Sequence, residues 1–240
     1  MTANSYSNKL KIKPVNYWYL AISFCLLYIV ISGFDIELGS LVKILYSISF
    51  YLFYYFATKK HNLFLIIIFV TFVSGEILVM IDLNLYFKEI VFLFMIGVLA
   101  MLMAFSRILK IKPQIITKEM VLEPVFGVLF CGYAIAHLVI VFYDSVPEKL
   151  LFVLAGILLF STTLICTLIP LRYRNSYNVT LYIIAGSLVI ESASAFIYYY
   201  SLRTSIILTL FNMSICLHKA TVTSYLVSLS KLLKDKELYI

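Results

Sequence analysis

Two acidic side chains stand inside long apolar stretches of this 240-residue chain, where an acid is hardest to accommodate. Glu76 is the only charged residue of the stretch 63–81, and Glu191 is the only charged residue of the stretch 178–200. Placing a charged side chain at the centre of a membrane costs roughly 2.5–3.5 kcal/mol, so such residues persist where they face a bundle interior or a wet cavity. We therefore take Glu76 and Glu191 as the candidate catalytic residues.

Two carboxyl groups that share a dry site can divide the roles of general acid and general base. This chemistry suits hydrolysis, or addition of water, on a lipid that enters sideways from the bilayer. Ser194 follows Glu191 by three residues and so lies on the same helix face, where its hydroxyl could orient the carboxylate. The same residue types also suit a proton-coupled transporter.

Further ionisable residues lie inside apolar stretches on other helices, among them Lys43, His137 and the adjacent pair His218 and Lys219. Lys43 near the outer end of its stretch is a candidate contact for a substrate phosphate, or a side chain that reaches the outer headgroups. His137 is a candidate substrate contact, or it hydrogen-bonds a neighbouring carbonyl group. Lys219, near the middle of the last stretch, is too deep to stand unpaired, so we expect an ion pair there.

The elements that must position these residues are membrane-spanning helices. The chain is 63% hydrophobic and 13% charged, with a mean hydropathy of +1.02, which excludes a soluble globular or a disordered protein. A span needs about twenty apolar residues, and eight such runs can be marked. The sequence thus predicts an all-α polytopic bundle of eight transmembrane helices at about 17–34, 38–57, 62–81, 87–106, 121–143, 149–170, 178–200 and 204–230.

The distribution of Lys and Arg predicts the orientation of the bundle. Fourteen of them fall in the two terminal segments and the second, fourth and sixth connections, whereas the alternate connections hold three. Because cytoplasmic loops retain positive residues, both termini should be cytoplasmic, and we expect a bacterial inner membrane. The domains are then a cytoplasmic segment 1–16, one transmembrane domain 17–230 and a cytoplasmic tail 231–240.

The net charge of +7 follows from this topology, and we find no nucleic-acid motif. The four cysteines lie in apolar runs without paired spacing, so we expect no metal site and no disulfide. No cofactor is indicated. The expected partner is a membrane lipid or lysophospholipid substrate, and assembly into a homo-oligomer is left open.

Two segments and their order resemble the YhhN family of lysoplasmalogenase-like membrane proteins. The segment 41–80 is similar to the family's second and third spans, where a Lys opens one span and a Gly-acid pair comes late in the next; Lys43 and Glu76 hold these positions. AGSLVIESASAF (185–196) is similar to the family's Gly-to-Ser-Asp helix. The resemblance implies an eight-helix bundle that hydrolyses the vinyl-ether bond of lysoplasmalogen with two acidic residues.

The chain departs from the family pattern at several positions. Ile44 replaces a Pro, Glu76 replaces an Asp, and the second Asp position falls on Ser194, with Glu191 one turn earlier. The His-x-x-Tyr pattern of the fourth span is missing from 97–108. The alternative is therefore a degenerate member that acts as a small-molecule or proton-coupled transporter or sensor. A retinal protein with Lys219 as the Schiff-base lysine is disfavoured by the even number of spans.

Overall fold

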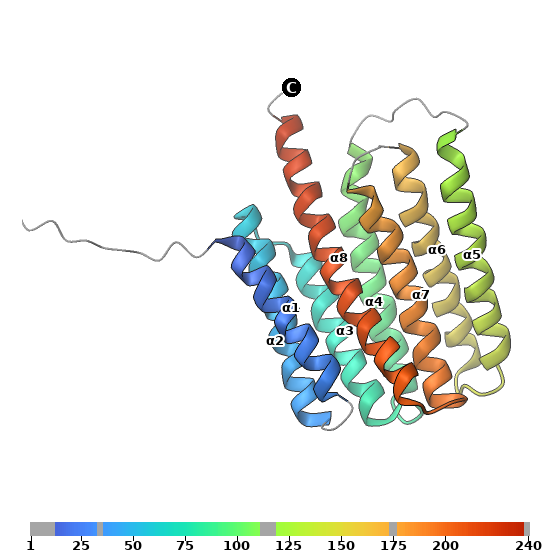
Figure 1. Cartoon of the computed structure of the whole chain (residues 1–240). Coiled ribbons are helices and arrows are strands. Elements are labelled where there is room, and N and C mark those ends of the chain that lie inside the picture. Colours follow the sequence, from blue (N-terminus) through green and yellow to red (C-terminus); the bar gives the residue numbers. More distant parts are fainter. Residues whose placement is uncertain (1–12, 33–35, 111–118, 173–176, 238–240) are drawn as a thin grey trace, which may run out of the picture.

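The computed structural model describes residues 13–32, 36–110, 119–172 and 177–237. These residues fold into one antiparallel helix bundle, shown in Figure 1, and they contain no strand. The predicted all-α class is therefore confirmed. The elements are α1 (Pro14–Ile31), α2 (Ile36–Thr58), α3 (Leu63–Asp82), α4 (Phe87–Phe105), the short 3-10 helix η1 (Ser106–Lys110), α5 (Glu119–Phe142), α6 (Lys149–Arg172), α7 (Asn178–Tyr200) and α8 (Ser205–Glu237).

The helix bounds follow local signals in the chain. Pro14 opens α1 at a position where its missing N–H is not needed. The Asn62 side chain accepts hydrogen bonds from the N–H groups of Phe64 and Leu65, so α3 begins there. The last helix differs from the prediction, because α8 continues through most of the expected tail 231–240. Good helix formers fill this segment, and Leu232 and Leu233 pack against the core.

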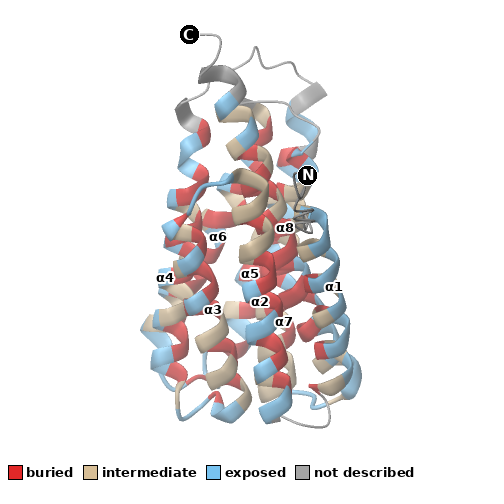
Figure 2. Ribbon diagram, turned by 90° about the vertical axis from the view of Figure 1, so that its left-hand side faces the viewer, coloured by how far each residue is buried: buried red, intermediate tan, exposed pale blue. Residues whose placement is uncertain are grey.

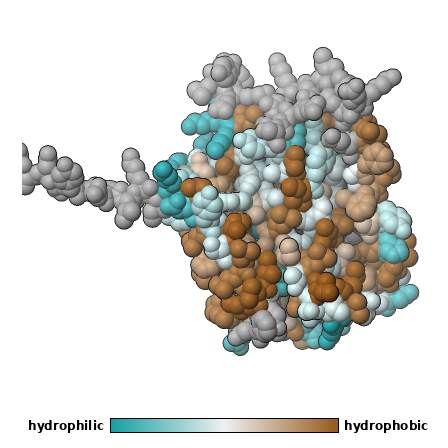
Figure 3. Space-filling model, in the orientation of Figure 1, coloured by the Kyte–Doolittle hydropathy of each residue, from teal (hydrophilic) through white to brown (hydrophobic). Residues whose placement is uncertain are grey.

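Within the described residues, eight helices are long and apolar enough to cross a membrane. Buried residues face the inside of the bundle in Figure 2, and exposed ones follow its outer faces. Many of these exposed residues are large and apolar, and they form much of the brown surface in Figure 3. Apolar side chains on the outside are what lipid contact requires. The protein is therefore an integral, multi-pass membrane protein.

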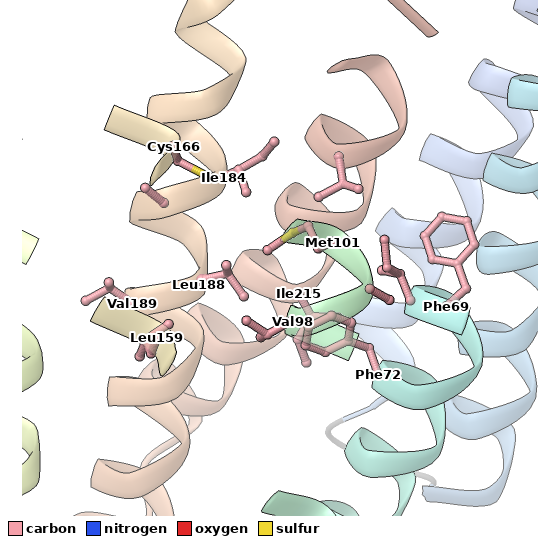
Figure 4. Close-up of a cluster of buried hydrophobic side chains, with 14 of the residues drawn as sticks. Phe69, Phe72, Val98, Met101, Leu159, Cys166, Ile184, Leu188, Val189 and Ile215 are labelled. Carbon is pink, nitrogen blue, oxygen red and sulfur yellow. The ribbon is translucent and has the colours of Figure 1, made fainter. Parts of the chain in front are cut away.

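All eight long helices contribute to the apolar core, and Figure 4 shows the part of it that lies between α3, α4, α6, α7 and α8. Helix α8 crosses the bundle at a slant and packs against α7, α2 and α1. Helices α3 and α4 approach closely at Gly97, where an added Cβ atom would lie 2.7 Å from the hydroxyl oxygen of Thr71. The slant of α8 matters most for the site, because it brings one helix against partners on both sides of the bundle.

Candidate functional site

An ion-pair cluster lies inside the bundle around the carboxylate of Glu76 on α3. Its Oε2 atom is 2.8 Å from Nζ of Lys219 on α8 and 3.4 Å from Nζ of Lys43 on α2. The three side chains are at most 5% exposed. A charge buried to this degree needs a partner of opposite sign, and here one acid meets two bases. The other oxygen of Glu76, Oε1, has no hydrogen-bond partner.

Polar groups of α1, α2 and α8 surround the two lysines. Lys219 also donates to the Tyr46 hydroxyl at 3.3 Å, and Nζ of Lys43 lies 4.9 Å from the centre of the Tyr28 ring. The Tyr28 hydroxyl donates to the side-chain oxygen of Asn212 at 2.8 Å, and the Asn212 amide donates to the Ser32 hydroxyl at 2.7 Å. These contacts tie α1, α2 and α8 together behind the ion pairs.

The second acid, Glu191 on α7, has a different neighbour. Its Oε2 atom is 3.3 Å from Nδ1 of His218 on α8, which is an ion pair only when the imidazole is protonated. Neither ring nitrogen of His218 makes a hydrogen bond, nor does Oε2 of Glu191, although all three atoms are buried. The His218 ring stands edge to face with Phe72, with ring centres 5.0 Å apart. Unsatisfied buried polar atoms are rare and often mark functional positions.

Both acids border the same cavity. It lies between α3, α4, α6, α7 and α8, and Leu138 of α5 also reaches it. The volume of the cavity is about 110 Å³. The wall is apolar apart from the two acids and two small hydroxyl side chains, Thr71 and Ser192. Figure 4 shows two of the wall residues, Phe72 on α3 and Leu159 on α6, on opposite sides of the core. A substrate group in this cavity would border both acidic residues.

The structure places the other predicted site residues outside this cavity wall. Lys43 is fully buried against Glu76, so it does not reach the outer headgroups, and it does not line the cavity. Ser194 is buried, but its hydroxyl donates to the carbonyl oxygens of Ile190 and Glu191 on its own helix. The predicted phosphate contact of Lys43 and the orienting role of Ser194 therefore have no support in these contacts.

His137 is exposed on the outside of α5, with its ring stacked on that of Tyr133. The next residue, Leu138, turns inward to the cavity. A helix rotates about 100° per residue, so one position decides between lipid and interior. The structure does not bring His137 to the two acids, and it is not a substrate contact in this cavity.

Sequence reasoning gave His218 no partner and did not identify Tyr46 or Asn212 at all. The only local signal was the adjacent polar pair His218 and Lys219 in the middle of an apolar helix. That signal predicts partners for both residues but cannot identify them, since Lys219 and Glu76 are 143 positions apart in the chain. The expected ion pair of Lys219 is confirmed.

Fold and site together define an all-α integral membrane protein with two buried acids on one apolar cavity. Comparison of the chain with models of protein families, with curated proteins and with solved structures gave no match. The assignment of a function therefore depends on the geometry of the site and on the sequence resemblance described above.

Proposed function

We propose that the protein is an intramembrane hydrolase of the YhhN type that cleaves the vinyl-ether bond of a lysoplasmalogen. The observation that carries this proposal is that Glu76 and Glu191, from helices distant in the chain, border one apolar cavity. An apolar wall suits the alkenyl chain of such a lipid. Two carboxyl groups with different neighbours are also what a reaction with one acid and one base requires.

The two acids can complete the reaction without another reagent besides water. Glu191 donates a proton to the outer carbon of the vinyl ether, which leaves a cationic oxocarbenium group. Water adds to this group and gives its proton to Glu76, forming a hemiacetal. Glu76 then returns that proton to the ether oxygen while Glu191 takes the hydroxyl proton. The carbon–oxygen bond breaks, an aldehyde and an alcohol leave, and both acids regain their first states.

The ion pairs support this assignment of roles. Glu76 lies against two ammonium groups, which suits a carboxylate base and keeps its side chain in position. Glu191 meets only the imidazole of His218, so a proton on this acid costs no ion pair with a lysine. Lys43 and Lys219 act through Glu76 and not on the lipid headgroup. We also infer that the lysine-rich ends of the bundle face the cytoplasm, in a bacterial inner membrane.

The direct test is aldehyde release from lysoplasmenylethanolamine by the purified protein in detergent. We expect Glu191→Gln to lower kcat by about 100-fold or more, because general acid catalysis contributes roughly 10²–10⁴. Glu76→Gln should also be inactive, and Glu76→Asp, which keeps the charge, should retain part of the activity. Glu89→Gln, an exposed acid at the start of α4, is the matched control and should be unchanged.

Two results would contradict the proposal. One is a folded wild-type protein that releases no aldehyde from this lipid. The other is a Glu191→Gln variant with unchanged turnover, since the one other acid that lines the cavity, Glu76, has the role of the base.

A second candidate is proton-coupled transport or sensing. The observation in its favour is a series of buried ionisable residues that extends from α2 through α3 and α8 to α7, namely Lys43, Glu76, Lys219, His218 and Glu191. Such series can carry protons in transporters. Proton-coupled uptake into proteoliposomes, lost in Glu191→Gln, would favour this function over hydrolysis.

A further inference from the structure

The charges around the cavity are distributed unequally. Glu76 and Glu191 are the only acidic or basic residues among those that line it. The basic partners, Lys43, Lys219 and His218, lie outside the lining. A ligand in the cavity therefore borders two acidic residues and no basic one.

The apolar part of the wall is rich in aromatic rings. Six phenylalanines contribute to it from five helices: Phe72, Phe87, Phe94, Phe152, Phe196 and Phe211. Phe152 and Phe196 are in contact, with ring centres 4.8 Å apart. Aromatic rings attract organic cations through the negative charge of their faces, and this attraction is larger where water is excluded. Rings together with carboxylates form a recognisable kind of site for an organic ammonium group.

We propose that this cavity is a binding site for apolar organic cations, in which a quaternary or protonated amine on an alkyl or aryl group lies beside Glu191. The inference deepens the proposed function and rests on it in one respect. The oxocarbenium group of the proposed reaction is also an apolar group with a positive charge, so a stable cation of similar size should bind where that group forms.

The size of the cavity sets the size of the cation. The volume of about 110 Å³ is smaller than the roughly 150 Å³ of a protein cavity that holds benzene, so it suits a cationic group smaller than benzene. A trimethylammonium group has fewer non-hydrogen atoms than benzene and matches this space. Benzyltrimethylammonium carries this group beside an aromatic ring and has a fixed positive charge.

The test measures binding of radiolabelled benzyltrimethylammonium to the protein in lipid nanodiscs by equilibrium dialysis. Neopentylbenzene has the same shape without the charge and serves as the competitor. We expect saturable binding that unlabelled benzyltrimethylammonium displaces and neopentylbenzene does not. Glu191→Gln should weaken the binding at least tenfold, whereas Glu89→Gln should leave it unchanged. Ala195→Phe, which fills the cavity from α7, should abolish it.

Equal displacement by neopentylbenzene, or full affinity in a folded Glu191→Gln variant, would overturn the inference. The unfolding temperature of each variant shows whether it is folded. Failure here and failure of the proposed hydrolysis can be told apart. Glu191-dependent binding without aldehyde release removes the hydrolase but keeps the cation site. Aldehyde release with no binding and no competitive inhibition by benzyltrimethylammonium removes the cation site alone.

Discussion

At the scale of single residues, His218 and Lys219 show how one helix serves two acids. Adjacent residues of an α-helix point about 100° apart, so they face different neighbouring helices. Lys219 points to Glu76 on α3, and His218 points to Glu191 on α7. The two contacts differ in kind. Lys219 donates a hydrogen bond to the carboxylate, whereas His218 lies within 3.3 Å of one without hydrogen bonding to it.

This difference predicts that a leucine substitution lowers the stability of the protein much more at Lys219 than at His218. Removing one partner of a buried ion pair costs roughly 3–5 kcal/mol, and Lys219→Leu should approach the lower figure because Lys43 still faces Glu76. His218→Leu should change stability little, since it removes polar atoms that have no hydrogen bond. Thermal unfolding of the two variants in the same detergent measures this difference.

A further variant checks the explanation. Glu76→Gln leaves two buried ammonium groups without a counter-charge, so it should lower the unfolding temperature more than Lys219→Leu does. If His218→Leu proves as damaging as Lys219→Leu, the imidazole is protonated and forms a true ion pair with Glu191.

At the scale of the element, the approach of α3 and α4 depends on a glycine. A Cβ atom at Gly97 would lie 2.7 Å from the Thr71 hydroxyl oxygen and 2.9 Å from the Phe72 ring. Both neighbours belong to the cavity wall, and Phe72 also holds the His218 ring. The spacing of these two helices thus affects the site as well as the core.

We therefore expect Gly97→Ala to destabilise the protein by about 1–3 kcal/mol, the usual cost of an added group in a packed interior. Gly186→Ala in α7 is the matched control, because a Cβ atom there has no neighbour within 4 Å. In that position alanine should be neutral or should stabilise the helix by roughly 0.5–1 kcal/mol. The unfolding temperatures of the two variants test this expectation. An equal loss of stability in both would show that close packing at Gly97 does not cause the destabilisation.

At the scale of the whole molecule, the eight long helices of the described residues alternate in direction, so α1 begins and α8 ends on the same side of the bundle. In Figure 1 the C-terminal ends of α2, η1, α6 and α8 lie at the top of the bundle, and the C-terminal ends of α1, α3, α5 and α7 lie at the bottom. The lysine-rich segments of the sequence adjoin the first group of helix ends. The arrangement of the helices therefore agrees with the two-sided distribution of charge.

This arrangement predicts which sites a reagent can reach from outside the cell. The four native cysteines are buried, so a thiol reagent should label an introduced, exposed cysteine and not the native ones. Leu85→Cys, in the exposed turn between α3 and α4, should react with a membrane-impermeant thiol reagent in intact cells. Lys60→Cys, exposed between α2 and α3, should react only after the membrane is broken. The reverse pattern would mean that the bundle is inserted the other way.

The sequence alone determined the eight helices, their antiparallel order and the two-sided charge. Each of these depends on residues that are close together in the chain: apolar runs of spanning length, short connections, and Lys or Arg beside helix ends. It also located Glu76 and Glu191 as the acids of interest, because a charge in an apolar run is costly wherever the helix lies.

Only the tertiary structure decided which side chains meet. In a soluble protein the apolar stripe of a helix shows which face is buried, but here the lipid and the core are both apolar, so that signal is weak. The rotation of α5 about its axis, which turns His137 outward and Leu138 inward, therefore cannot be predicted from the sequence of the helix. The slant of α8, which joins Lys219 to Glu76 and His218 to Glu191, likewise results from packing between helices that are distant in the chain.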